Sequence, residues 1–319
     1  MRRILVTGAL GQIGSELTPA LRARYGSDRV VASDIRMIRL EEVDQDGPFE
    51  YIDCTRLREI QEVVRKYDVG TIYHLAALLS AVAEDKPHAA WDINMGGLYR
   101  VLEAARRNRC AVFFPSSIGA FGPGTPTVDT PQETIQRPTT MYGVTKVSGE
   151  LLCDYYFRRF GVDTRGVRYP GLISYVAPPG GGTTDYAVEI FHSALRHQRY
   201  TCFLEPATRL DMMYMPDAIR AAIELMEADA GRLEHRNAFN VTAMNFTPEE
   251  LASEIGRHLP DFTIDYDVDP VRQAIADSWP DSMDDSAARD QWGWKASFDL
   301  EAMTRDMLEK LGDQARDGG

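Results

Sequence analysis

A glycine-rich turn near the start of the chain separates an apolar segment from a helical pattern. Residues 3–7 are mainly apolar, and apolar residues at helical spacing from 13 to 21 predict a helix after the turn. Gly8 permits a tight turn, Gly11 lets a pyrophosphate approach the backbone, and Gly14 lets the helix pack closely on the strand. Such a unit binds a dinucleotide at the helix N-terminus, although the glycines alone are also compatible with a structural turn. The expected cofactor contacts in the turn are Gly8, Gly11, Gln12, Ile13 and Gly14.

An acidic residue follows the second apolar strand, which we expect at 29–33. Asp34 stands twenty residues beyond Gly14, where a carboxylate can accept hydrogen bonds from the adenosine ribose and repel a 2′-phosphate. Arg36 argues for NADP, and Asp34 could also be a solvated strand end. The position of the carboxylate favours NAD as the cofactor.

The alternation of strands and helices predicts the fold class. Strand patterns at 3–7, 29–33, 51–54 and 71–75 are separated by helical patterns, as in a parallel sheet with helices on both faces. A chain of 319 residues is long enough for one such unit and a smaller lobe. We therefore predict an α/β protein with a Rossmann-type doubly wound parallel sheet and a smaller C-terminal substrate-binding lobe. The ligand crevice should lie at the carboxyl ends of the strands.

The expected division of the chain is not contiguous. Residues 1–170 should form the NAD-binding domain, to which residues 211–245 return. The substrate-binding lobe should consist of residues 171–210 and 246–319.

A tyrosine and a lysine four residues apart are the candidate chemical centre. Tyr142 and Lys146 would lie one turn apart on the same face of a helix. The Lys146 ammonium would favour the phenolate and lower the pKa of Tyr142 from about 10. A phenolate is a suitable base for an alcohol that loses a hydride. The pair is a weak signal alone, but here it follows a strand at 110–114 that ends in Ser116 and Ser117.

These motifs resemble those of the extended class of short-chain dehydrogenases, which includes nucleotide-sugar epimerases. That resemblance rests on residues 1–170. The second half is more specific, because PGGGTTDYAVEIF and TRLDMMYMPDA, together with PSSIGAFGP, resemble the short-chain type of L-threonine 3-dehydrogenase. Asp211 departs from that family, in which proline is frequent at this position.

The resemblance implies an activity and a set of site residues. It implies NAD-dependent oxidation of L-threonine to 2-amino-3-oxobutanoate by a homodimer. Tyr142 is the implied base, Lys146 also binds the nicotinamide ribose, and Ser117 is the catalytic hydroxyl, with Ser116 as the alternative. Further implied cofactor contacts are Asp53, Cys54, Leu75, Ala76 and Ala77. The implied substrate contacts are Ser80, Ser117, Tyr142, Gly182, Thr183 and Thr184.

A glycine- and proline-rich segment at 178–182 precedes two threonines. We expect Thr183 and Thr184 to cap a helix that runs to about residue 197, so that its N-terminus can receive a substrate carboxylate. The alternative interpretation of 178–182 is a plain linker. Asn94 and His74 are expected to have structural roles, and Met212, Met213 and Met215 are expected in the core.

Charge and composition exclude several classes of function. The formal net charge of −13 disfavours nucleic acid and anionic membranes as partners, and no long apolar segment is present. Four cysteines without a CxxC pair are typical of reduced thiols in a cytoplasmic protein, and no histidine or cysteine cluster predicts a metal site. A nucleotide-sugar 4-epimerase or dehydratase remains the main alternative. A non-catalytic NAD sensor is less favoured, because such a protein would not need the base that the Tyr142 and Lys146 pair provides.

Overall fold

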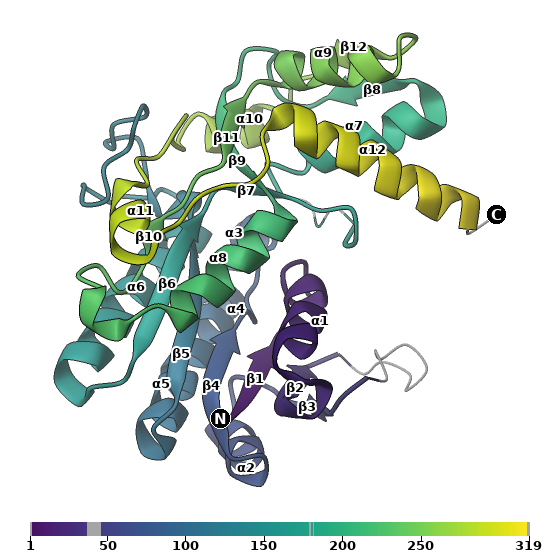
Figure 1. Ribbon diagram of the computed structural model, residues 1–319. Helices are drawn as coiled ribbons and strands as arrows, with labels where there is room; N and C mark the ends of the chain where they lie inside the picture. Colours follow the sequence, from purple (N-terminus) through teal and green to yellow (C-terminus); the bar gives the residue numbers. More distant parts are fainter. Residues whose placement is uncertain (1, 37–45, 179, 181, 318–319) are drawn as a thin grey trace.

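The computed structural model describes residues 2–36, 46–178, 180 and 182–317 of the chain. Seven parallel strands form the main sheet in the order β10-β6-β5-β4-β1-β2-β3 (Figure 1). The predicted α/β class with a Rossmann-like parallel sheet is confirmed. Its strands are β1 (Arg3–Thr7), β2 (Val30–Asp34), β3 (Phe49–Tyr51), β4 (Val69–His74), β5 (Ala111–Ser117), β6 (Thr164–Tyr169) and β10 (Phe239–Asn240).

Helices cover both faces of this sheet because its strands are apolar on both sides. In β1, Ile4 and Val6 pack into one buried cluster, while Leu5 between them packs into the other. The first face is covered by α1 (Gly14–Tyr25), α8 (Met215–Glu227) and α11 (Ser286–Trp292). The second face is covered by α2 (Leu57–Lys66), α5 (Gly96–Asn108) and α6 (Met141–Phe160).

A smaller lobe lies beyond the carboxyl ends of the main strands (Figure 1). One of its sheets has the order β11-β9-β7, and the other pairs β12 with β8. These strands are β7 (Gly171–Ile173), β8 (Arg199–Cys202), β9 (Leu210–Tyr214), β11 (Met244–Phe246) and β12 (Thr263–Tyr266). The helices of the lobe are α7 (Tyr186–His197), α9 (Pro248–His258), α10 (Pro270–Ala276) and α12 (Leu300–Asp317).

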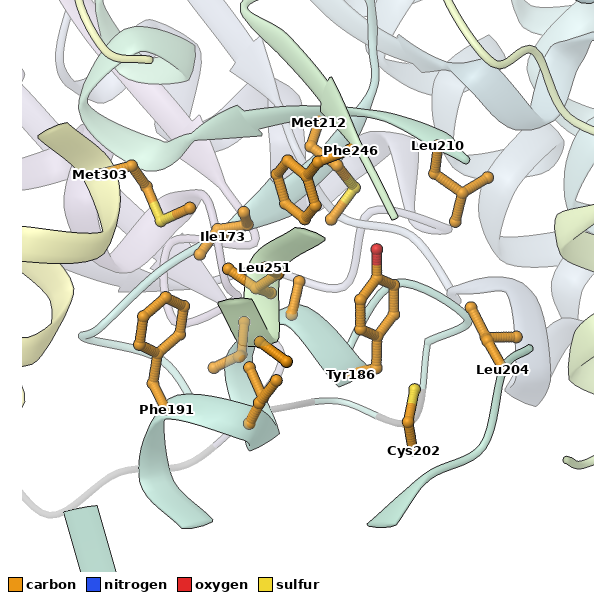
Figure 2. Packing of buried hydrophobic residues seen from close by; sticks show 14 of the residues in the cluster. Ile173, Tyr186, Phe191, Cys202, Leu204, Leu210, Met212, Phe246, Leu251 and Met303 are labelled. Carbon is orange, nitrogen blue, oxygen red and sulfur yellow. The ribbon is translucent and has the colours of Figure 1, made fainter. Parts of the chain in front are cut away.

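The smaller lobe has its own buried core. Figure 2 shows Phe191 of α7, Met212 of β9, Leu251 of α9 and Met303 of α12 around the same apolar interior. Met213 and Met215 are buried in the first-face cluster of the main sheet instead. The prediction that the three methionines are core residues is confirmed.

Short helical segments connect these elements. They are α3 (Ser80–Asp85), α4 (Pro87–Ala90), the π-helical turn η2 (Trp91–Met95), and the 3-10 turns η1 (Ser27–Arg29), η3 (Ile118–Ala120) and η4 (Ala230–Arg232). Within the predicted return segment 211–245, β10 pairs with β6 of the main sheet, whereas β9 pairs with β7 and β11. The division into two domains stays a prediction.

No helix in the parts of the chain that the structure describes is both long enough and apolar enough to cross a membrane.

Candidate active site

The glycine turn between β1 and α1 has no space for side chains at its key positions. Gly8 has a φ of +74°, and a Cβ there would lie 2.7 Å from the backbone nitrogen of Ala76. A Cβ at Gly14 would collide with the carbonyl oxygen of Gly8 and the backbone of Ala9. The helix therefore starts in direct contact with the end of the strand, as a pyrophosphate-binding turn requires.

Asp34 ends β2 beside this turn. One carboxylate oxygen, Oδ2, accepts a hydrogen bond from Leu10 N at 3.1 Å. The other, Oδ1, accepts from Arg36 N at 3.0 Å and from Arg36 Nε at 3.2 Å. Asp34 is 6% exposed, so its carboxylate is fixed by the turn on one side and by the Arg36 side chain on the other.

A cavity of about 360 Å³ opens beside Asp34 and the glycine turn. β3 ends at Tyr51, earlier than the predicted strand at 51–54, so Asp53 and Cys54 lie in the loop that follows and reach the cavity wall. The predicted cofactor contacts that line it are Gly8, Gly11, Asp34, Asp53, Cys54, Leu75, Ala76 and Ala77. This set brings together the ends of four strands, β1 to β4, and fits the adenosine half of a dinucleotide.

A second cavity, of about 140 Å³, continues past Leu75 and Ala77 to Tyr142 and Lys146. Gln12 and Ile13 of the glycine turn line it, so the two cavities meet along the expected path of the cofactor. All six predicted substrate contacts line this second cavity: Ser80, Ser117, Tyr142, Gly182, Thr183 and Thr184.

The start of α6 places the tyrosine in the cavity. Thr140 caps the helix, because its Oγ1 accepts a hydrogen bond from Gly143 N at 3.1 Å. Tyr142 therefore lies in the first turn, and Lys146 follows one turn later on the same face. A Cβ at Gly119 would lie 3.3 Å from Tyr142 Cδ1 and 3.5 Å from Ser117 Oγ, so the bare backbone of Gly119 lets the phenol and the serine approach each other.

The two neighbouring serines have different surroundings. Ser116 is buried and donates a hydrogen bond to the Glu150 carboxylate. Ser117 Oγ accepts from Gly119 N at 3.1 Å and is also hydrogen-bonded to Tyr142. This arrangement favours Ser117 over Ser116 as the hydroxyl beside the tyrosine.

The prediction that Lys146 lowers the pKa of Tyr142 is wrong for this structure. Burial raises the pKa of Tyr142 to about 12, and the hydrogen bond with Ser117 opposes the rise. Burial lowers the pKa of Lys146 to about 8, opposed by the charge of Glu150. The physical reason is that Lys146 Nζ donates to the Pro115 carbonyl oxygen at 2.6 Å and lies 5.2 Å from the centre of the Tyr142 ring.

The N-terminus of α7 also differs from the prediction. The helix begins at Tyr186, and neither Thr183 nor Thr184 caps it. The residue before the helix is Asp185, whose carboxylate accepts a hydrogen bond from Gly182 N at 2.7 Å. Thr183 and Thr184 nevertheless lie in the cavity wall, one and two residues before Asp185. Pro179 and Gly181 of the predicted loop lie outside the described residues.

Several residues in the cavity wall were not among the predicted contacts, and Asp185 and Trp279 are two of them. Asp185 directly follows Thr184, so an acidic residue before a helix was a signal that the sequence did contain. Trp279 follows α10 and reaches the cavity from a segment far away in the chain. No local pattern could have predicted Trp279, because only the packing of the smaller lobe brings it to Tyr142.

Two polar residues near the cavity have the structural roles that the sequence predicted. Asn94 Oδ1 accepts from Leu78 N at 2.8 Å, and its amide nitrogen donates to Leu78 O at 3.1 Å. His74 is buried, with its Nδ1 2.8 Å from Thr7 Oγ1, and burial lowers the pKa of its imidazole to about 3. His74 is therefore neutral. Across the described residues, no group of three His, Cys, Asp or Glu side chains is placed to hold a metal ion.

The geometry of a dinucleotide turn, an acidic strand end and a Tyr-Lys pair agrees with the chain's similarity to known proteins. A model of the NAD dependent epimerase/dehydratase family matches residues 4–242. An uncharacterized epimerase/dehydratase of Staphylococcus aureus (strain USA300) is 57% identical over 311 residues, covering 98% of this chain and 97% of the relative. The chain belongs to the NAD-dependent epimerase/dehydratase family. The predicted cofactor, NAD, is confirmed for the family.

Two solved structures are closely similar to the chain over nearly its whole length. An L-threonine dehydrogenase from Clostridium difficile has 60% sequence identity and a TM-score of 0.96, with 98% of each chain covered. The holo form of a GalE-like L-threonine dehydrogenase from Cupriavidus necator has 51% identity and a TM-score of 0.94, covering 97% of this chain and 99% of that one. The resemblance to threonine dehydrogenases that the second half indicated is confirmed.

Proposed function

We propose that this chain oxidises L-threonine to 2-amino-3-oxobutanoate with NAD. The observation that carries the proposal is the cavity at Tyr142, whose volume is about 140 Å³ and whose wall contains all the hydroxyl residues expected to contact threonine. Pockets for drug-sized ligands occupy roughly 300–1,000 Å³, so this cavity suits a small metabolite. The high identity to threonine dehydrogenases supports the same substrate.

The residues of the cavity have separate roles in the reaction. Tyr142, once ionised, removes the proton from the threonine hydroxyl, while Ser117 holds that oxygen beside the phenol. NAD held by the glycine turn, Asp34 and Lys146 would supply the hydride acceptor for Cβ, so that the alcohol carbon of threonine would become a ketone and NADH would form. Lys146, one turn further along α6, can bind the nicotinamide ribose. Thr183 and Thr184 offer hydroxyl groups to the substrate carboxylate.

Basic residues of the smaller lobe do not support the epimerase alternative. A nucleotide-sugar diphosphate would require cations near the cavity, and the smaller lobe contains Arg196, Arg199 and Arg209. Arg199 pairs with Asp265 and Arg209 pairs with Glu250. None of the three arginines is among the described residues that line the cavity at Tyr142. The intact Tyr142 and Lys146 pair in turn disfavours a non-catalytic NAD sensor.

We infer that the protein is a homodimer. The outer faces of α5 and α6 carry large apolar side chains that are at least 40% exposed: Tyr99, Leu151, Tyr155 and Phe160. The ring centres of Tyr155 and Phe160 lie 5.7 Å apart, so these two side chains are in contact. An exposed apolar patch on two adjacent helices is typical of a protein interface. Replacing Leu151 and Tyr155 by glutamate should yield monomers in sedimentation velocity, whereas an already monomeric wild type would contradict the inference.

We also infer a cytoplasmic location from the four free cysteines. Each of these thiols is buried and none forms a disulfide. Buried free thiols suit a reducing compartment. Recovery of the enzyme in a periplasmic or secreted fraction of its source cells would contradict this inference.

A direct assay tests the catalytic proposal. Purified protein should form NADH when L-threonine is added with NAD, and it should not interconvert UDP-glucose and UDP-galactose. Tyr142→Phe protein is the matched control, because it keeps the fold and loses only the hydroxyl. Epimerase activity without threonine-dependent NADH formation would replace the proposal by its main alternative.

A further inference from the structure

A buried ion pair lies directly behind the catalytic residues. Glu150 follows Lys146 by one turn of α6 and is 5% exposed, and Arg168 of β6 is 6% exposed. Arg168 Nη2 donates to Glu150 Oε2 at 2.9 Å, and Arg168 Nε donates to Oε1 at 3.1 Å. The carboxylate and the guanidinium therefore meet through two parallel hydrogen bonds, the geometry that holds both groups most rigidly.

Each partner of this pair is also fixed by other elements. Gln136 Nε2 donates to Glu150 Oε2 at 3.0 Å. Arg168 Nη1 donates to the carbonyl oxygen of Gln132 at 2.8 Å and to Asn240 Oδ1 at 3.0 Å. The ion pair thus joins α6, β6, β10 and the segment before α6 into one unit.

One contact of Glu150 leads to the catalytic serine. Ser116, the neighbour of Ser117 on β5, donates its hydroxyl proton to Glu150 Oε1. Ser116 and Ser117 are consecutive residues of one strand, and their side chains point to opposite faces. The hydrogen bond that anchors Ser116 to α6 therefore fixes the end of β5 from which Ser117 reaches Tyr142.

The charge of Glu150 also acts on Lys146. The other groups that face the lysine do not supply a counter-charge: His74 on β4 is neutral, and Tyr142 and Cys153 on α6 are protonated at neutral pH because burial raises the pKa of each. Arg168 on β6 lies behind Glu150 and carries a positive charge. Among the described groups that act on Lys146, Glu150 contributes the largest opposing charge.

We propose that Glu150 is a positioning residue of the active site, which orients Ser117 through Ser116 and keeps Lys146 in its ammonium form through its negative charge. This inference rests on the proposed function, because it assumes that Tyr142, Lys146 and Ser117 carry the chemistry. Glu150 itself does not line the substrate cavity among the described residues, so it acts through its neighbours.

The first test separates the charge from the hydrogen bond. In Glu150→Gln the shape is kept and the negative charge is lost, so Lys146 should lose its proton at lower pH. The alkaline limb of the kcat/KM profile, where loss of the Lys146 proton ends the rise with pH, should then begin about one pH unit lower, the lower end for the effect of a nearby opposite charge. The affinity for NAD, measured by fluorescence titration, should change by less than about twofold, because Glu150 does not contact the cofactor cavity.

The second test removes only the link to the serine. Ser116→Ala leaves the Glu150–Arg168 pair intact, so kcat should fall roughly tenfold through the misplaced Ser117, while the alkaline limb stays in place. Glu254→Gln is the matched control, because Glu254 is a buried carboxylate paired with Arg257 on α9 in the smaller lobe. That variant should have the wild-type kcat and pH profile.

Glu150→Gln leaves Arg168 buried without its partner and could fail to fold. In that case Glu150→Gln combined with Arg168→Gln removes both charges, and its alkaline limb should still move to lower pH. An unmoved limb in the variant that folds overturns the role of the charge, and a wild-type kcat in Ser116→Ala overturns the role of the hydrogen bond. If Tyr142→Phe retains activity, it is the proposed catalytic function that fails instead.

Discussion

The Nζ of Lys146 lies 2.6 Å from the carbonyl oxygen of Pro115, so the ammonium group contacts the end of β5 instead of the Tyr142 hydroxyl. Lys146 is held in this position by burial between β5 and α6 and by its contact with the Phe114 ring, 5.0 Å away. The pKa of Tyr142 consequently depends more on its apolar surroundings than on a positive charge. Burial raises the pKa of Tyr142 to about 12, so its side chain is a neutral phenol at neutral pH.

Tyr142→Phe should lower kcat/KM for L-threonine by at least about 100-fold, the lower end for the loss of a general base. The ring and the shape of the cavity are kept, so the Kd for NAD should barely change. Both quantities can be measured on the same preparation, by NADH formation and by fluorescence titration. Near-wild-type turnover would remove Tyr142 from the mechanism.

Activity should rise with pH from about 6 to about 8, where Lys146 begins to lose its proton. Because burial raises the pKa of Tyr142 above its ordinary value, the phenolate is a minor form at neutral pH, and its fraction grows close to tenfold per pH unit below the pKa. The measurement is the pH profile of kcat/KM at saturating NAD. A flat profile, or the same rise in the residual activity of Tyr142→Phe, would assign the ionisation to another group.

The first half of the chain was largely predictable because its signals are local. The turn at Gly8 and the carboxylate of Asp34 each follow a strand directly, and parallel strands bring their carboxyl ends to one edge of the sheet. Spacing alone likewise placed Tyr142 and Lys146 on one helical face. Recognition of the family supplied the substrate residues, which no periodicity could have identified.

Other features depend on three-dimensional packing and were missed or mispredicted. The pKa of Tyr142 depends on burial and on the direction of the Lys146 side chain, neither of which follows from spacing. Asp185, and not a threonine, directly precedes α7, and its carboxylate accepts a hydrogen bond from Gly182 N. Trp279 joins the cavity only when the smaller lobe has folded.

The cofactor preference should depend on the charge of Asp34. Asp34→Asn keeps an oxygen that can accept from Leu10 N but removes the charge that opposes a 2′-phosphate and that binds Arg36. The ratio of kcat/KM with NAD to that with NADP should fall by about tenfold, equivalent to about 1.4 kcal/mol. Arg24→Gln, at a surface ion pair with Glu227, is the control and should leave the ratio unchanged. A wild type that already prefers NADP would contradict the role given to Asp34.

The enzyme should keep full activity after treatment with EDTA. Tyr142 supplies the base and NAD the hydride acceptor, so the proposed chemistry has no step that requires a Lewis acid. The measurement is threonine-dependent NADH formation before and after dialysis against the chelator, together with the metal content of the protein. Loss of activity that added zinc restores would contradict this prediction.

Recognition of the substrate carboxylate should depend on the Thr184 hydroxyl. Thr184 lines the cavity just before α7, and its methyl group faces Gly171, where an added Cβ would lie 2.7 Å from Thr184 Cγ2. This packing fixes the side chain, so Thr184→Val replaces the hydroxyl by a methyl group of similar size with little change in shape.

A hydrogen bond to a charged group contributes about 1.5–3 kcal/mol, so KM for L-threonine should rise by on the order of tenfold or more. The Kd for NAD should stay the same, because Thr184 is not among the described residues that line the adenosine cavity. Thr201→Val, on the exposed side of β8, is the matched control and should leave KM unchanged. An unchanged KM in Thr184→Val would mean that the carboxylate binds elsewhere in the cavity.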